Sequence, residues 1–225
     1  MKLIVSNSND PYYNIAAEKY ILTERLNEDV LFIYINNPCV VVGRNQNPEA
    51  EVDIKYCREN NIPVLKRLSG GGTVYHDCGN INYCFVKTKG EGLVLDEDFL
   101  EPIVRILSGL GINAEKGKRK DLWLNGKKVS GTAFHITRSR IMFHGTLLYD
   151  SDLDMLEKSL KGDESKRGKK IASVRSEVTN IRQHMAEKLP VKDFFTKLIE
   201  GSMEYFSVEN YELLSGSLPD NEDMP

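Results

Sequence analysis

Residues 67–77 read RLSGGGTVYHD, directly after the apolar run at 62–65 and overlapping a second apolar run at 73–75. Three consecutive glycines expose backbone N–H groups and let a ligand approach the main chain closely. Successive N–H groups in such a turn form a concave site for an anion. The stretch lacks the Gly-Lys-Ser/Thr of a P-loop, and it leads into a strand pattern, whereas a dinucleotide-binding fingerprint leads into a helix. From the residues alone, an anion-binding turn and a purely structural turn are equally good interpretations.

Before the glycines, the sequence predicts helices and short strands. Asp10-Pro11 marks a helix start, since aspartate caps helices and proline favours their first position, and apolar residues recur at helical spacing through residue 26. Two β-rich runs, Val30–Ile35 and Cys39–Val42, are joined by Asn36-Asn37-Pro38 and predict a hairpin. Residues 52–60 predict a second helix, and residues 62–65 a strand that enters the glycines.

After the glycines, hairpins alternate with separate helices. Asn125-Gly126 is the strongest short hairpin signal, here between predicted strands at 121–124 and 127–134. The other expected elements are a strand at 81–86, a helix at 99–107 ended by Gly109 and Gly111, a hairpin turn near 137–140 before a strand at 141–149, a charged mobile surface loop at 161–170, a helix at 191–206 and a frayed tail at 215–225. This order predicts the α+β class, with a mixed, largely antiparallel sheet packed with helices.

Composition excludes several classes of function. The chain has 225 residues, 40% of them hydrophobic, and a formal net charge of -3, so it carries no overall nucleic-acid footprint. Its four cysteines form neither a C-x-x-C pair nor a zinc spacing. The first ten residues turn polar too soon for a signal peptide, and no apolar run is long enough to span a bilayer. These features predict a cytoplasmic protein with no membrane partner.

Several ordered motifs resemble those of one known family. Residues 67–80, RLSGGGTVYHDCGN, look like the signature of the lipoate–protein ligase A family, part of the biotin/lipoate ligase catalytic-domain superfamily. The other segments that match in order are DPYYN at 10–14, GRNQN at 43–47, KVSG at 128–131, HGTLL at 144–148, SVRS at 173–176 and Thr179-Asn180. The match covers roughly residues 3–207.

The resemblance implies a biotin/lipoate-ligase-like fold and a two-step, ATP-dependent reaction. Lipoate and ATP, with magnesium, form lipoyl-AMP, and the lipoyl group then passes to a lysine of a lipoyl carrier domain. The implied partners are E2 subunits of 2-oxoacid dehydrogenases and the glycine cleavage H protein. Acyl-adenylate chemistry needs a cation where negative charge builds up, and it needs a pocket poor in water.

The same resemblance implies roles for individual residues. Lys128 is the expected catalytic residue, touching the lipoyl carbonyl and the α-phosphate; strand alternation does not distinguish it from Lys127, and its place directly before Val129-Ser130-Gly131 does. The expected ATP-binding residues are Arg67, Gly72, Thr73, Val74, Tyr75 and Lys128. The expected lipoate-binding residues are Gly70, Gly71, His76 and Lys128, and Asp121 is the candidate magnesium contact. His76 also fits a purely structural role, and the cation-rich loop at 162–176 is expected to order over the adenylate.

Two other functions stay open at this point. A lipoyl or octanoyl transferase would need a nucleophilic cysteine after the lysine motif, but the last cysteine, Cys84, precedes Lys128. Longer family members carry an accessory domain after the catalytic one. We expect a catalytic domain at residues 1–207 and a C-terminal tail at 208–225 without that accessory domain. A half-ligase or lipoate-binding subunit that needs a separate accessory subunit is therefore the second alternative.

Overall fold

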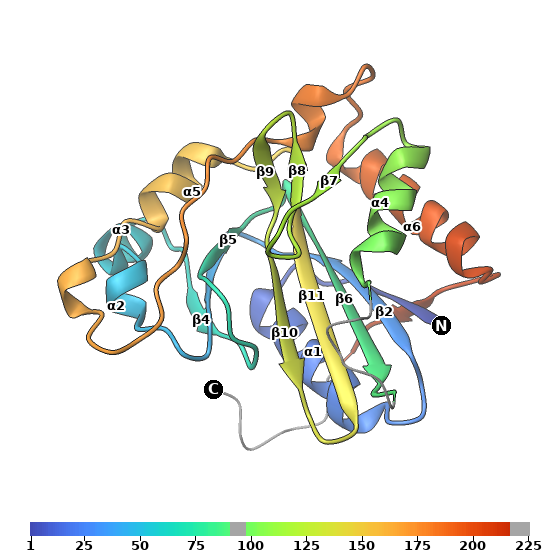
Figure 1. Ribbon diagram of the computed structural model, residues 1–225, viewed down its shortest axis with the longest axis horizontal. Helices are drawn as coiled ribbons and strands as arrows, with labels where there is room; N and C mark the ends of the chain where they lie inside the picture. The colour runs from blue at the N-terminus through green and yellow to red at the C-terminus, as the bar shows by residue number, and fades with distance from the viewer. Residues whose placement is uncertain (91–97, 217–225) are drawn as a thin grey trace.

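The computed structural model describes residues 1–90 and 98–216. Its centre is a six-stranded sheet with the order β10-β11-β6-β2-β1-β12 (Figure 1). The pairs β10–β11, β11–β6 and β6–β2 are antiparallel, whereas β2–β1 and β1–β12 are parallel. The strands are β1 (Lys2–Ser6), β2 (Val30–Ile35), β6 (Asn80–Thr88), β10 (Thr132–Ile136), β11 (Arg140–Leu148) and β12 (Glu212–Leu214). The predicted α+β class with a mixed, largely antiparallel sheet is confirmed.

Two smaller sheets flank this one, each with three strands. The first has the order β4-β3-β5 and the second β7-β8-β9. Their strands are β3 (Cys39–Val42), β4 (Val64–Lys66), β5 (Val74–His76), β7 (Glu115–Lys116), β8 (Leu122–Leu124) and β9 (Lys127–Ser130). The helices are α1 (Pro11–Glu24), α2 (Pro48–Glu51), α3 (Ile54–Glu59), α4 (Leu100–Gly109), α5 (Leu153–Ser159) and α6 (Val191–Phe206), with 3-10 turns at Glu164–Lys166 and Ile181–His184.

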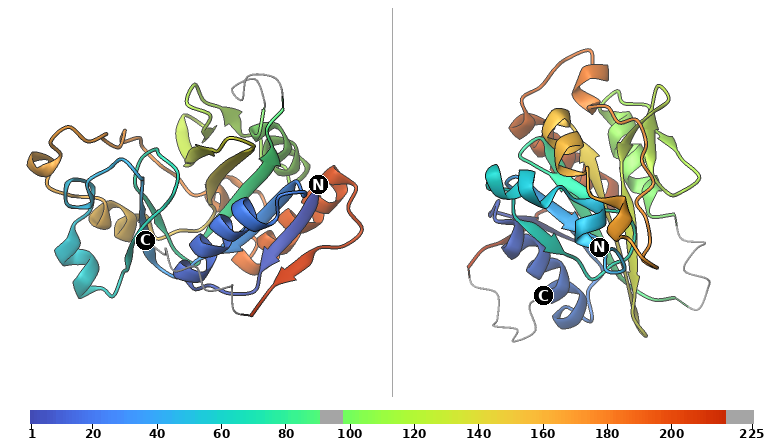
Figure 2. Two further views of the ribbon diagram at one scale, coloured as in Figure 1. Left: turned by 90° about the horizontal axis from the view of Figure 1, so that it is seen from below. Right: turned by 90° about the vertical axis from the view of Figure 1, so that its left-hand side faces the viewer.

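Helices cover both faces of the large sheet. On one face, α4 and α6 bury residues such as Ile103 and Leu198 against alternate strand residues, including Phe85 and Phe143. On the other face, α1 packs over the intervening strand positions. The β4-β3-β5 sheet, with α2, α3 and α5 around it, lies beside α1 on the same side (Figures 1 and 2). Two surfaces of β-structure therefore face each other at the middle of the molecule.

Several local predictions are confirmed. The Asp10 side chain accepts a hydrogen bond from the Tyr12 N–H at 2.9 Å, so it caps α1 as expected. Asn125 and Gly126 both have positive φ, 49° and 77°, as a tight turn of type I′ requires between β8 and β9. The predicted turn near 137–140 joins β10 to β11, and the predicted helices at 99–107 and 191–206 correspond to α4 and α6.

The predicted hairpin of Val30–Ile35 and Cys39–Val42 is wrong. β2 pairs with β1 and β6 in the large sheet, whereas β3 pairs with β4 and β5 in the small one. Nearly every residue of both strands is buried, which is typical of central strands with two covered faces. Each strand has a partner on both edges within its own sheet, so neither has a free edge for the other. The short linker therefore leads from one sheet into the other.

Other elements differ in extent. The predicted helix at 52–60 corresponds to α3, which the Asp53 side chain caps, and the short helix α2 before it ends at Glu51. The predicted strand at 127–134 is broken at Gly131, after which β10 enters the large sheet. β1, α2, β7, α5 and β12 were not predicted, and β12 lies within the range expected to be a tail, whose residues from 217 on lie outside the described residues. None of the described helices is long and apolar enough to cross a membrane.

Candidate adenylate site between two sheets

Two adjoining cavities lie where the large sheet faces the β4-β3-β5 sheet. The first, of about 310 Å³, is lined from α1, both sheets and the loop at 171–174. The second, of about 460 Å³, opens toward α5 and the segment 173–178. Both are lined by Thr73, Val74, Lys128, Gly131, Thr146, Ser173 and Val174. The structure thus offers two compartments joined at Lys128, as a reaction between two substrates needs.

Arg67 holds the glycine loop from inside the protein. Its Nη2 atom donates to the carbonyl oxygens of Gly70 and Gly72, both at 2.6 Å, and Nη1 donates to the Val41 carbonyl at 2.9 Å. Nε donates to the Ser69 hydroxyl at 2.9 Å. Burial lowers the pKa of the Arg67 guanidinium to about 10. Arg67 borders the first cavity, so its charge reaches a ligand there while its hydrogen bonds brace the loop.

The glycines differ in their exposure to the cavities. Gly71 and Gly72 line the first cavity, as the sequence predicts for ligand contacts. Gly70 is not among the residues that line either cavity, and its carbonyl accepts from Arg67. Gly71 has a positive φ of 84°, which favours glycine. Residues 70–72 therefore combine one structural position with two that face the cavity.

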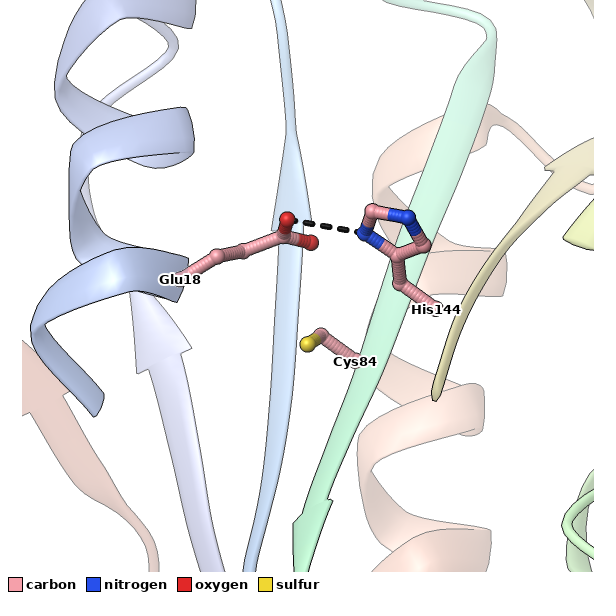
Figure 3. A group of neighbouring side chains, drawn as sticks. All are labelled: Glu18, Cys84 and His144. Atoms are coloured by element: carbon pink, nitrogen blue, oxygen red, sulfur yellow. Dashed lines mark hydrogen bonds and ion pairs between the residues drawn. The ribbon is translucent and has the colours of Figure 1, made fainter. Parts of the chain in front are cut away.

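A buried chain of hydrogen bonds anchors the loop to α1. The His144 Nε2 atom lies 2.6 Å from the Ser69 hydroxyl, and Nδ1 lies 2.8 Å from the Glu18 carboxylate. Figure 3 shows the Glu18 carboxylate and the His144 ring facing each other, with Cys84 beside them. Among the described residues these three form the one group that could hold a metal ion. Burial raises the pKa of the Cys84 thiol well above its usual value, and metal ligation needs the thiolate, so a hydrogen-bonded anchor suits this group better.

His76 lies at the wall of the first cavity with a defined tautomer. Asn14 donates to the Asn36 side-chain oxygen at 2.8 Å, which leaves the Asn36 amide N–H to donate to His76 Nδ1 at 3.1 Å. The proton of the neutral ring is therefore on Nε2, which has no hydrogen-bond partner among the described residues. Burial, more than the nearby Arg67 and His144, lowers the pKa of His76 to about 3. His76 thus offers a neutral donor beside the cavity.

Lys128 points into the junction of the two cavities. Its ammonium lies 3.2 Å from the Asp121 carboxylate, which is only 5% exposed. The neighbouring Lys127 points outward and pairs with Glu177 at 2.6 Å. Strand alternation leaves open which of Lys127 and Lys128 faces the cavities. The geometry of the β8–β9 hairpin directs Lys128 toward them. The Lys128 backbone also bonds to Glu177 and Thr179, which fixes strand β9 against the segment 177–179.

Asp121 does not fit a resident magnesium ion. Its carboxylate is already paired with Lys128, and among the described residues it joins no cluster of potential metal ligands. Magnesium in nucleotide sites is held by one or two carboxylates together with substrate phosphates. The donors here suit only an ion that arrives with a nucleotide, and the observed partner of Asp121 is Lys128.

The start of β5 completes the wall between the cavities. Val74 lines both cavities, and Tyr75 lines the second. The Thr73 N–H donates to the Ser173 hydroxyl at 2.9 Å, and the Thr73 hydroxyl donates to the Gln46 side-chain oxygen at 2.9 Å. The main chain that was predicted to bind a nucleotide therefore borders the cavities, and one of its N–H groups is bonded to the loop at 171–174.

Three residues that line the first cavity were not predicted from the sequence. Arg119 lines the first cavity and a neighbouring groove with Lys118, close to Asp121. Tyr34 and Asn82 line the first cavity from β2 and β6. Tyr34 also donates to Glu18 at 2.9 Å. A basic run at 116–120 was the available signal for Arg119, whereas nothing short of the strand pairing places Tyr34 and Asn82 in the site.

Comparisons with known proteins agree on one family. The family described as the lipoyl protein ligase A/B catalytic domain matches residues 10–202. A lipoate–protein ligase of Bacillus subtilis is 40% identical over 196 residues, 86% of this chain and 59% of the relative. Lipoate–protein ligase 1 of Staphylococcus aureus is 39% identical over 217 residues, 95% of this chain and 66% of the relative. The chain thus spans less than two thirds of the length of these two relatives.

A solved structure has the same fold. It comes from the structural analysis of a bi-partite lipoate protein ligase and its E2 lipoyl domain from Thermoplasma acidophilum. The likeness has a TM-score of 0.80 and 27% sequence identity, and it covers 95% of this chain and 87% of that one.

Proposed function

Because the chain belongs to the lipoyl protein ligase A/B catalytic-domain family, we propose that it activates lipoate with ATP and transfers the lipoyl group to a carrier lysine. The observation that carries this proposal is the position of Lys128, whose ammonium lies at the junction of the two cavities beside the buried Asp121. Lipoate and ATP are the proposed substrates, and magnesium would come with ATP. The proposed acceptors are lipoyl domains of E2 subunits and the glycine cleavage H protein.

The first step joins the two substrates. A carboxylate oxygen of lipoate attacks the α-phosphorus of ATP, and pyrophosphate leaves, which forms lipoyl-AMP. Negative charge builds up on the α-phosphate oxygens, so a positioned cation stabilises the transition state. Lys128 supplies that cation, and the Asp121 carboxylate, which pairs with the Lys128 ammonium, orients it.

The second step transfers the acyl group. The neutral amine of the carrier lysine attacks the acyl carbonyl, the mixed-anhydride bond breaks, and AMP leaves with the electron pair while the amine loses a proton. Lys128 contacts the carbonyl and phosphate oxygens in this step as well. Arg67, Gly71, Gly72 and the start of β5 form the wall of the site, and His76 donates toward the first cavity.

A transferase mechanism through a thioester is disfavoured by the cysteines. Cys39, Cys57 and Cys84 are buried, and Cys78 is exposed. None of them is among the described residues that line the two cavities. A nucleophilic cysteine must touch the acyl group.

The four cysteines form no disulfide, which supports a cytoplasmic location as a further part of the proposal.

The second candidate function is a half-ligase that works with a separate accessory subunit. The relative from Thermoplasma acidophilum, which is described as bi-partite, favours this candidate. We propose that the catalytic domain extends beyond the expected boundary at 207 to residue 214, because β12 pairs with β1 in the large sheet.

Two assays separate these functions. Lipoate-dependent ATP–pyrophosphate exchange reports adenylation, and transfer from synthetic lipoyl-adenylate to a lipoyl domain reports the second step. A complete ligase performs both, a half-ligase performs only the transfer, and a binding subunit performs neither. Lys128→Ala should abolish exchange with an unchanged Tm. Lys127→Ala is the matched control, since that ammonium pairs outward with Glu177. Exchange at the wild-type rate in Lys128→Ala would refute the assignment.

A further inference from the structure

Two polar side chains of the segment 43–51 are buried beside the site described above, although neither is assigned a part in the reaction. Gln46 is 1% exposed and Glu51 is 6% exposed. Burying an amide or a carboxylate is costly unless hydrogen bonds compensate it. Each of the two side chains forms a hydrogen bond with Ser173, in the loop at 163–175 that borders both cavities.

Gln46 joins this loop to the glycine loop. Its Nε2 donates to the Ser173 hydroxyl at 2.9 Å, and its Oε1 accepts from the Thr73 hydroxyl at 2.9 Å and from the Gly43 N–H at 3.2 Å. The Ser173 hydroxyl also accepts from the Thr73 N–H at 2.9 Å. One side chain therefore fixes the distance between the two segments that bound the adenylate site.

Glu51 holds the same serine from the other side. Its Oε2 accepts from the Ser173 N–H at 3.1 Å, and its Oε1 lies 3.5 Å from Arg167 Nε. The buried carboxylate thus gains a backbone donor and a cation, both from the loop. Glu51 therefore attaches the loop through one charge-assisted hydrogen bond, the stronger kind, and one ion pair.

Peripheral contacts continue the attachment along the loop. Asn47 Nδ2 donates to the Lys166 carbonyl at 2.6 Å, and the Asp163 N–H donates to the Glu49 carbonyl at 2.9 Å. Val174 follows directly after Ser173 and lines both cavities although 58% of it is exposed. The loop is therefore docked beside the reacting space, and its apolar side chain lies at the mouth.

We propose that Gln46 and Glu51 are positioning residues that hold the 163–175 loop closed through Ser173 and thereby retain the acyl-adenylate. The proposal rests on the function proposed above. Exclusion of water protects a reactive intermediate from hydrolysis, so a looser loop wastes adenylate without slowing its formation. The segment 43–51 thus controls how much activated lipoate reaches the carrier protein.

Limited proteolysis of the ligand-free protein tests the attachment without any need for activity. Trypsin sites at Lys166, Lys169 and Lys170 lie in the loop. Ser173→Ala and Glu51→Gln should be cut about twofold to tenfold faster than wild type, the factor carried by one net hydrogen bond. Ser165→Ala is the matched control, because its hydroxyl bonds only to Asp163 in the same loop. Unchanged cleavage in Ser173→Ala, at an unchanged Tm, would overturn the proposal.

A partition experiment tests retention. The reaction contains lipoate, Mg-ATP and a lipoyl domain, and the measured quantity is the amount of lipoyl-AMP released or hydrolysed divided by the amount of lipoyl groups transferred. This ratio should rise in Ser173→Ala and Glu51→Gln and stay at the wild-type value in Ser165→Ala. Faster cleavage with an unchanged ratio would refute the role in retention. A wild-type chain that forms no adenylate would refute the proposed function, while the proteolysis result still decides whether the loop is held through Ser173 and Glu51.

Discussion

Replacing Gly43 with alanine should damage the glycine loop from 28 positions away in the chain. The backbone of Gly43 is not left-handed, so alanine fits its conformation. A Cβ there would, however, lie 2.2 Å from the Gly71 carbonyl oxygen and 3.0 Å from Gln46 Oε1. The methyl group would meet the main chain of the loop, which has no flexible side chain that could move aside.

The size of the effect follows from this distance. Real Cβ contacts essentially never fall below 3.0 Å, so Gly71 must retreat by at least 0.8 Å from its 2.2 Å position. Displacement of about 1 Å in a reacting site costs on the order of 100-fold in rate. Overpacking costs about 1–3 kcal/mol of unfolding free energy, and each kcal/mol lowers the Tm of a chain of this size by about 2–4 °C. We expect adenylation to fall by on the order of 10–100-fold.

The assay is lipoate-dependent ATP–pyrophosphate exchange, with the Tm measured in parallel. If the chain performs only the transfer step, transfer from synthetic lipoyl-adenylate replaces exchange. Gly109→Ala is the matched control, because a Cβ added at this position, at the end of α4, would have no atom within 4 Å. Full exchange in Gly43→Ala would show that the loop tolerates the shift, and the proposed dependence of the site on this contact would fall.

Three further predictions concern single side chains. Arg119→Ala should slow ATP–pyrophosphate exchange by about tenfold or more, the worth of one charged hydrogen bond to the part of ATP that leaves as pyrophosphate. It should spare transfer from synthetic lipoyl-adenylate, because pyrophosphate has already left; equal losses in both assays would contradict this. Asp121→Asn should lower kcat for exchange more than KM for lipoate, since Lys128 loses its orienting partner at 3.2 Å; a change confined to KM would contradict it. His76 has a folded pKa of about 3 against about 6.5 when unfolded, so the stability it contributes is fully present above pH 6.5 and is lost as the pH falls toward 3. Because the loss of about 1.4 kcal/mol per pH unit begins near pH 6.5, urea unfolding should show wild type losing about 2 kcal/mol more than His76→Gln between pH 7 and 5; parallel profiles would contradict it.

Local chemistry explains the elements that could be predicted. A cap and a proline start α1, and positive φ at Asn125 and Gly126 forms the β8–β9 turn, because these residues act on their immediate neighbours. The ordered motifs led to Lys128, Arg67 and the glycines, and the structure brings all but Gly70 to the walls of the cavities. Gly70 accepts from Arg67, a hydrogen bond that only the folded loop reveals.

Strand pairing could not be predicted from short linkers. β2 and β3 look like a hairpin because three residues separate them, yet each is buried on both faces and pairs within a different sheet. The role of Gln46 was hidden for a similar reason. Its partners, Thr73 and Ser173, lie 27 and 127 residues away in the chain.

Period, caps and turns determined where helices and strands begin, because those signals act over a few bonds, whereas the residues expected to carry the chemistry came from the ordered family motifs. The tertiary structure decided that Lys128 rather than Lys127 faces the reacting space, that Arg67 braces the loop whose glycines line the cavity, and that the segment 43–51 docks the loop at 163–175. Those outcomes depend on burial and hydrogen bonding between segments far apart in the chain. Only the packing of the two sheets against each other brings such segments within bonding distance.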